Sequence, residues 1–163
     1  MEITKRNEHY QLYKEPLAVG QLAKPFHLKD LKEQVHRLGD FLDKPTLISI
    51  VPDINTSVCS IQTRAFNERL SQNKQIHFVT ISNNTLAQQQ HWCAAEGLDL
   101  VMLHDPENTF GKDYGVYIPD LNIYARAIFV LDTEGNICYE EIVPELTHEP
   151  DYEQAIAALD ALQ

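Results

Sequence analysis

The sequence predicts an α/β protein in which helices flank a central mixed β-sheet. Two nearly all-apolar, β-branched runs, Thr46–Val51 and Ile76–Ser82, have the length of strands buried on both faces. A helical pattern follows each of them, and a strand–turn–strand pattern and a last helix complete the chain. The 163 residues, 44% of them hydrophobic, are enough for one core. We therefore expect a single domain over residues 1–163.

The first third of the chain predicts short strands. Ile3–Lys14 alternates polar and apolar residues and suits a small β-hairpin. We expect this hairpin as an extension over residues 1–16, before a core that begins at about residue 17. Two further short strands are expected at Phe26–Leu31 and Gln34–Leu38, ahead of the first buried strand.

Three helices are expected after the first buried strand. The first, Ser57–Leu70, has apolar residues at helical spacing, so we expect its apolar side to face the sheet and Gln62 to face water. The apolar side consists of Val58, Ile61, Ala65 and Phe66. The second, Thr85–Glu96, stops at Gly97, a typical helix end. The third is Asp151–Leu162 at the end of the chain.

The remaining segments complete the topology. Leu100–Leu103 is expected as a short strand and Phe110–Val116 as a short helix or turn. Ala127–Leu131 and Asn136–Val143 flank the turn residues 132–135 and predict a hairpin. A βαβ half followed by a ββα half is typical of a thioredoxin-like sandwich, with the chemistry between the first long strand and its helix.

Charge and composition exclude several functions. The chain has 13 Lys and Arg and 24 Asp and Glu, which gives a net charge of −11. Nucleic acid and anionic membranes are therefore not expected as partners. No run approaches the roughly 18 apolar residues of a membrane span. Met1–Tyr13 lacks the apolar core of a signal peptide, so we expect a cytoplasmic protein. The three cysteines are too few for a disulfide scaffold.

Cys59 is the strongest candidate for a reactive group. It lies in the first turn of the expected helix Ser57–Leu70, where free backbone N–H groups and the helix dipole favour a thiolate. Thr56 has its hydroxyl within reach of that sulfur, and Pro52 walls the site without an N–H of its own. The competing interpretation is that Cys59 is a small buried apolar residue.

The pattern Pro52-x-x-x-Thr56-x-x-Cys59 resembles the peroxidatic motif of the peroxiredoxins. Three further blocks resemble the thiol peroxidase subfamily, an atypical two-cysteine class. These blocks are His91–Gly97, Ala125–Ala127 and Thr147–Tyr152. They stand in the family's order, and the resemblance runs from about residue 19 to the end of the chain. In place of the family's frequent Asp-Leu-Pro-Phe-Ala-Gln, this chain has Asn83-Asn-Thr-Leu-Ala-Gln88.

This resemblance implies a thioredoxin-fold peroxidase that needs no metal, haem or flavin cofactor. The family reduces hydrogen peroxide and organic hydroperoxides, is usually regenerated by thioredoxin, and commonly forms homodimers. Transferred to this sequence, the peroxide site consists of Pro52, Thr56, Cys59 and Arg126, and the resolving cysteine is Cys93.

Peroxide chemistry gives Arg126 an independent rationale. Cleavage of an O–O bond moves negative charge onto the departing oxygen, which a guanidinium and backbone N–H groups stabilise. Arg126 directly precedes the buried strand Ala127–Leu131, where sheet neighbours could bring it close to Cys59. The competing interpretation is a strand-end arginine that pairs with an acid.

The resemblance also implies an intrachain disulfide between Cys59 and Cys93. The two thiols lie on different expected helices, whereas a disulfide needs Cα atoms about 4.4–6.8 Å apart. We therefore expect local unwinding before the bond forms. Cys138, in a predicted strand, is interpreted as structural.

Several alternatives stay open at this stage. Another peroxiredoxin class would share the Pro-Thr-Cys core, but one such class has a second cysteine where this chain has Arg64. A disulfide oxidoreductase would need a CxxC pair, which is absent. In a different class, a redox sensor would use Cys59 oxidation as a signal without multiple turnover. For assembly, Tyr114–Pro119 is expected to offer a dimer surface.

Overall fold

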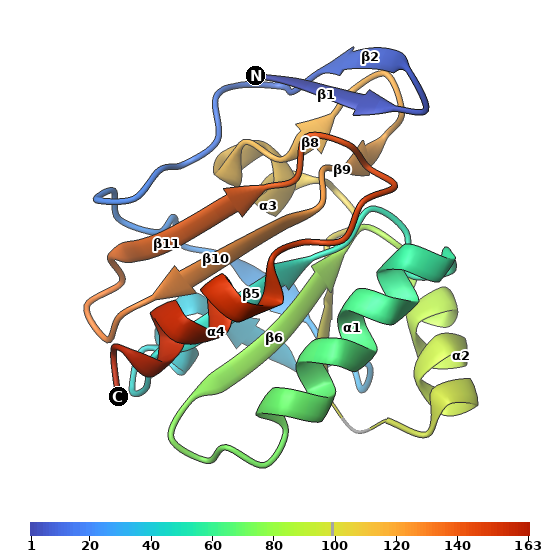
Figure 1. The fold of residues 1–163 in the computed structure, drawn as a ribbon. Helices are drawn as coiled ribbons and strands as arrows, with labels where there is room; N and C mark the ends of the chain where they lie inside the picture. The colour runs from blue at the N-terminus through green and yellow to red at the C-terminus, as the bar shows by residue number, and fades with distance from the viewer. Residues whose placement is uncertain (99) are drawn as a thin grey trace.

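A seven-stranded mixed sheet forms the centre of the molecule (Figure 1). The computed structural model describes residues 1–98 and 100–163. The three strands in the middle of the order run parallel, and the flanking strands pair antiparallel. In spatial order the strands are β11 (Ile137–Ile142), β10 (Ala127–Leu131), β5 (Thr46–Ile50), β6 (His77–Ser82), β7 (Val101–His104), β3 (His27–Lys29) and β4 (Val35–Arg37). The predicted mixed sheet is confirmed.

Three helices cover one face of this sheet: α1 (Ser57–Leu70), α2 (Leu86–Glu96) and α4 (Tyr152–Asp160) (Figure 1). Their bounds agree closely with the predicted helices. As predicted, Gly97 ends α2, in the left-handed conformation with a φ of 66°. Among residues 1–98 and 100–163, no helix is long and apolar enough to cross a membrane.

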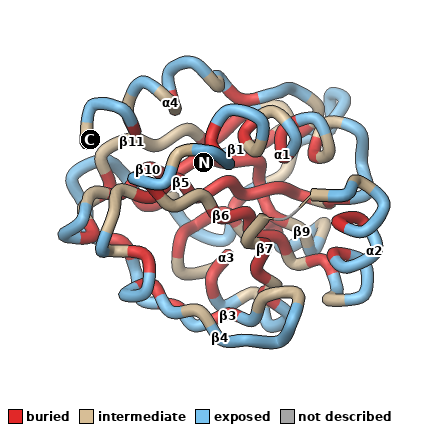
Figure 2. The backbone as a smooth tube through the Cα atoms, turned by 90° about the horizontal axis from the view of Figure 1, so that it is seen from below, coloured by how far each residue is buried: buried red, intermediate tan, exposed pale blue. Residues whose placement is uncertain are grey.

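The opposite face carries the larger apolar cluster, which includes residues of β3 and of α3 (Thr109–Tyr114). All five residues of β5 and of β10 are buried, and these strands lie in the interior in Figure 2. The sequence pattern did not reveal three small elements on the far side from α1. These are the 3₁₀ helix η1 (Leu38–Phe41) and the paired strands β8 (Tyr117–Ile118) and β9 (Ile123–Tyr124).

The N-terminal hairpin is present as predicted. Strands β1 (Glu2–Lys5) and β2 (Glu8–Gln11) pair antiparallel around Arg6 and Asn7, whose φ angles are 49° and 72°. Two positive φ values match the twist that a two-residue hairpin turn requires. The hairpin lies along one end of the sheet, beside the segment that follows β11 (Figure 1).

The predicted buried side of α1 is correct at Phe66 but wrong at Ile61 and Gln62. Ile61 has 39% of its surface exposed, whereas Gln62 has none. The helix contacts α2 as well as the sheet, so its buried side is set by both neighbours. Gln62 is accommodated there because its Nε2 donates to Ser49 Oγ at 2.8 Å, and a buried amide with a partner costs little.

The segment Tyr114–Pro119, expected to offer a dimer surface, is only partly exposed. Tyr114, Val116 and Ile118 have no exposed surface, whereas Tyr117 is half-buried and Pro119 is exposed. The Tyr114 ring stacks on Phe110 with centroids 4.1 Å apart, and its hydroxyl donates to the Lys24 carbonyl at 2.7 Å. Tyr114 therefore belongs to the core and does not contribute to an exposed surface, and the dimer itself stays a prediction.

Candidate active site

Cys59 lies where the chain leaves β5 and begins α1. Thr56 is the N-cap of the helix, which places Cys59 in the first turn, as predicted. The side chain of Cys59 has no exposed surface. First-turn N–H groups have no partner within the helix, so this end favours negative charge.

Two donors reach the Cys59 sulfur from outside the helix. The backbone N–H of Asp53 and Nη1 of Arg126 each lie 3.4 Å from Sγ. One donor belongs to the loop before α1, and the other comes from a residue 67 positions later in the chain. Hydrogen bonds from a cation and a backbone amide are those that stabilise a thiolate.

Arg126 is held almost entirely by neutral acceptors. It is 2% exposed and precedes β10. Its Nε and Nη2 donate to the Leu146 carbonyl at 3.2 and 2.6 Å, and Nη1 donates to Gln62 Oε1 at 3.0 Å. No salt bridge joins Arg126 to a carboxylate among residues 1–98 and 100–163. The alternative of a strand-end arginine paired with an acid is therefore wrong.

Pro52 and Thr56 lie in the loop that shapes this site. Pro52 is buried. Thr56 is exposed, and its hydroxyl donates to the Asp53 carbonyl at 2.9 Å. Within the described part of the chain, no hydrogen bond joins that hydroxyl to the sulfur. In this state, Thr56 holds the turn that aims the Asp53 N–H at Cys59.

Cys93 shares an apolar cluster with Cys59 but forms no disulfide with it. It lies on α2 and is 6% exposed. Burial raises the pKa of the Cys93 thiol to about 11, so it is neutral while the helices are closed. Two contacts tie α1 to α2: Trp92 Nε1 donates to Ser60 Oγ at 2.7 Å, and Arg64 pairs with Glu96 at 3.1 Å.

Comparison with known proteins decides the family. Residues 18–156 match the family model described as Redoxin. The thiol peroxidase of Streptococcus pneumoniae is 43% identical over 148 residues, which are 90% of this chain and 91% of that protein. The thiol peroxidase of Bacillus subtilis is 39% identical over 163 residues, 99% and 98% of the two chains.

The chain belongs to the thiol peroxidases of the redoxin family. Among solved structures, a peroxiredoxin-like protein from Aquifex aeolicus is 26% identical with a TM-score of 0.94, covering 99% of this chain and 97% of that one. The thiol peroxidase of Chromobacterium violaceum, 18% identical, has a TM-score of 0.88 over 98% and 96% of the two chains and supports the fold alone. The predicted fold class and family are confirmed.

Sequence reasoning missed two side chains near the site of this thiol peroxidase. The apolar pattern of α1 predicts that Gln62 faces water, although its spacing of three residues from Cys59 places it on the same helix side. From the sequence, Asn84 is only a departure from the family pattern. It is buried, and its Oδ1 accepts from the Ile54 N–H at 2.9 Å while its Nδ2 donates to Asp53 Oδ1 at 2.9 Å. Asn84 therefore fixes the loop that supplies the Asp53 donor.

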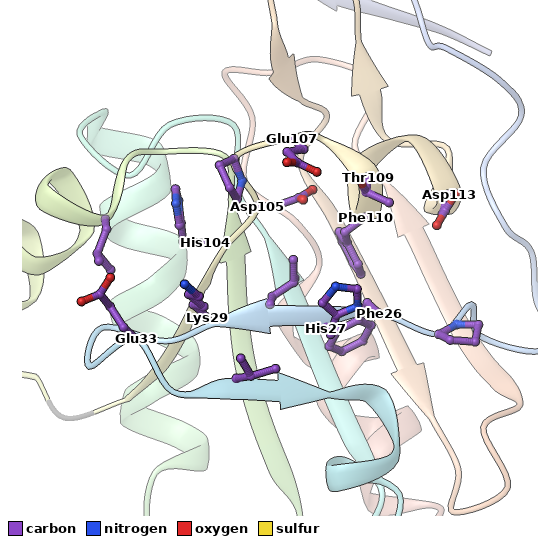
Figure 3. Close-up of a pocket in the computed structure, with 15 residues that line it drawn as sticks. Phe26, His27, Lys29, Glu33, His104, Asp105, Glu107, Thr109, Phe110 and Asp113 are labelled. Carbon is purple, nitrogen blue, oxygen red and sulfur yellow. The ribbon is translucent and has the colours of Figure 1, made fainter.

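A separate cavity of about 460 Å³ is lined by neither Cys59 nor Arg126 (Figure 3). It is lined from β3, β7 and α3, and Figure 3 labels His27, Lys29, His104 and Asp105 among its walls. None of the four predicted peroxide-site residues lines it. The predicted peroxide site around Cys59 is therefore distinct from this cavity.

Cys138 does not belong to the apolar cluster that contains Cys59 and Cys93. It is half-buried on β11, at the edge of the sheet, and its thiol contacts the Asn136 carbonyl at 3.6 Å. Burial raises the pKa of this thiol as well. Its structural role stays a prediction, and its position makes it a useful control.

Arg126→Lys should lower kcat/KM for hydroperoxide by roughly tenfold or more, because lysine keeps the charge but loses the planar fork. Steady-state kinetics with wild type and variant measure this. Arg64→Lys, on the exposed side of α1, is the matched control and should stay within about twofold. Equal, small effects of the two changes would contradict a role for Arg126 in the chemistry.

Proposed function

We propose that this chain reduces hydrogen peroxide and organic hydroperoxides with Cys59 as the peroxidatic nucleophile. One observation carries this assignment: the buried Cys59 sulfur lies 3.4 Å from both Arg126 Nη1 and the Asp53 N–H. Membership of the thiol peroxidases supports the same chemistry.

In the first step, the Cys59 thiolate attacks the terminal peroxide oxygen. The S–O bond forms as the O–O bond breaks, and the electron pair leaves with the second oxygen. That oxygen takes up a proton and departs as water or an alcohol, which leaves Cys59 as a sulfenic acid. Arg126 and the Asp53 N–H, already aimed at this point, offset the charge that moves from sulfur to oxygen.

Pro52 and Thr56 complete the peroxide site. Pro52 is buried and has no N–H that would compete for the substrate. Thr56 is exposed at the entrance, so its hydroxyl can turn toward an incoming peroxide oxygen. Both roles are supported by their places in the Pro-Thr-Cys motif beside Cys59.

In the second step, the Cys93 sulfur attacks the sulfenic acid of Cys59 and releases water. An intrachain disulfide results. The neutral, buried Cys93 thiol is a poor nucleophile, with a pKa of about 11. Opening of the α1–α2 contacts would expose it to water, lower its pKa and bring the two sulfurs together.

A dithiol reductant then returns both cysteines to thiols, and we assign this role to thioredoxin. The cytoplasm is the proposed compartment, and antioxidant defence and redox homeostasis are the proposed cellular roles. The family resemblance supports these assignments, together with an acidic surface that disfavours nucleic acid and membranes as partners.

Cys59→Ser should abolish thioredoxin-dependent peroxide turnover while the fold survives, because the change removes the nucleophile and little volume. A coupled turnover assay and circular dichroism measure the two properties. Cys138→Ser should behave as wild type. A folded Cys59→Ser protein that keeps most of its turnover would contradict the assignment of Cys59 as the nucleophile. Wild type that stops after about one peroxide would identify a sensor instead.

One equivalent of peroxide should produce a Cys59–Cys93 disulfide and expose parts of α1 and α2. Non-reducing peptide mapping identifies the pair, and hydrogen exchange on reduced and oxidised protein reports the exposure. The cost of unwinding a turn is comparable with the roughly 2–4 kcal/mol that a disulfide contributes. A Cys59–Cys138 pair, an interchain pair, or equal protection in both states would contradict this prediction.

We expect a homodimer with two independent sites, since each chain carries both cysteines. The support is that the family commonly forms homodimers; the segment first expected as the dimer surface is exposed only in part, at Tyr117 and Pro119. Light scattering at micromolar concentration, in both redox states, measures the mass. A monomer in both states would refute the dimer.

A further inference from the structure

The N-terminal hairpin is hydrogen-bonded to the segment that follows β11. The Thr4 N–H donates to the Pro144 carbonyl at 2.8 Å, and the Leu146 N–H donates to the Thr4 carbonyl at 2.9 Å. These two bonds form a short parallel bridge between Thr4 and Glu145. The hairpin thus fixes the backbone on both sides of Glu145.

The Glu145 carboxylate strengthens this connection. Its Oε1 accepts from Thr4 Oγ1 at 2.9 Å and from the Arg6 N–H at 3.1 Å. Its Oε2 accepts from the hydroxyl and the N–H of Thr147, at 2.6 and 2.8 Å. The Thr147 hydroxyl contributes most to lowering the pKa of Glu145 from its ordinary 4.5 to about 2, so the acceptor is charged at neutral pH.

Leu146, which follows Glu145 and is bonded to Thr4 through its N–H, provides the main hydrogen-bond acceptor for Arg126. The Leu146 carbonyl receives both Nε and Nη2 of the guanidinium, and this leaves Nη1 directed at Cys59. The Leu146 side chain is 4% exposed and belongs to the same core cluster as Ile3 of β1. A continuous chain of contacts therefore joins the hairpin to the reactive sulfur.

We propose that the hairpin, through Thr4 and Glu145, positions the Arg126 guanidinium against Cys59, which makes Glu145 a positioning residue for peroxide reduction. This inference rests on the proposed roles of Cys59 and Arg126. The fork of an arginine is planar and rigid, so a shift of the Leu146 carbonyl moves Nη1 with it. A misplacement of about 1 Å at a reacting centre lowers a rate by as much as roughly a hundredfold.

The test compares two reactions of one sulfur. In a Cys93→Ser, Cys138→Ser background, Cys59 is the only thiol. Its single-turnover oxidation by hydrogen peroxide is followed by the fluorescence of Trp92, the one tryptophan, and verified by mass. Its alkylation by iodoacetamide is measured on the same samples. Peroxide oxidation needs Arg126 at the leaving oxygen, whereas alkylation does not, so the ratio of the two rates reports the position of Arg126.

Thr4→Val and Glu145→Gln should each lower this ratio by roughly fivefold or more, well within the range for a misplaced catalytic group. Thr4→Ser keeps the hydroxyl and should restore it. Glu141→Gln is the matched control: its carboxylate, on β11 itself, accepts from the Asp151 N–H at 2.9 Å, and within the described part of the chain it has no hydrogen bond to Leu146. It should leave the ratio unchanged.

A last comparison distinguishes an effect on the position of Arg126 from a general loss of structure around the site. In an Arg126→Lys background, Glu145→Gln should have no further effect on the ratio, because both changes act on one contact chain. Additive effects, or a ratio that changes less than about twofold in the first two variants, would overturn the inference. If the Cys93→Ser, Cys138→Ser protein without further changes does not react with peroxide at Cys59, the proposed function itself is overturned.

Discussion

The structure depends on a guanidinium buried beside a thiol. Removing an arginine from water is costly unless its donors are satisfied, and in the described part of the chain those of Arg126 meet a carbonyl, an amide oxygen and the Cys59 sulfur. No carboxylate in residues 1–98 and 100–163 forms an ion pair with it. Among the described hydrogen-bond partners of Arg126, the sulfur is the group that can take up a compensating negative charge by losing a proton. Reaction with peroxide moves that charge by about a bond length, to an oxygen within reach of the same donors, so little has to reorganise.

The helices that cover this face of the sheet differ in how they contact it. Helix α4 and the far end of α1 meet the sheet through an apolar cluster that includes Phe66, Leu70 and Leu159. Beneath the start of α1 and α2, a smaller apolar cluster that includes Cys59, Trp92 and Cys93 lies beside polar contacts: Gln62 donates to Ser49, and Gln89 donates to Ser82. Water can replace the polar partners when a helix lifts, whereas the burial of the apolar cluster is lost. Opening of the segments that carry both cysteines therefore has a cost set by both kinds of contact.

The sequence was sufficient for features with a local signature. Cys59 follows a buried strand at a helix start, and Arg126 precedes another buried strand, so both were candidates from their neighbours, and the resemblance to the peroxiredoxin motif selected them. Three parts of the site could not be identified in this way. The Asp53 N–H and the Leu146 carbonyl are main-chain groups, which leave no trace in residue type. The burial of Gln62 depends on how α1 rotates against α2 and the sheet, and this rotation is a tertiary property that the weak apolar periodicity of the helix does not determine.

Asn84 lies in the segment where the sequence departs from the family pattern, and its contacts show what this residue does. It stands at the start of the segment that leads into α2. Its side chain bonds both to the Asp53–Ile54 loop and to Gln88, and its carbonyl accepts from His104 Nδ1 at 2.8 Å. The loop that aims a donor at Cys59 is therefore anchored to the helix that carries Cys93. Because one amide bonds to both, movement of α2 toward a disulfide would strain the Asn84–Gln88 bond and, through Asn84, the loop that carries the Asp53 donor. The proposed steps of peroxide attack and resolution are therefore linked by a single side chain.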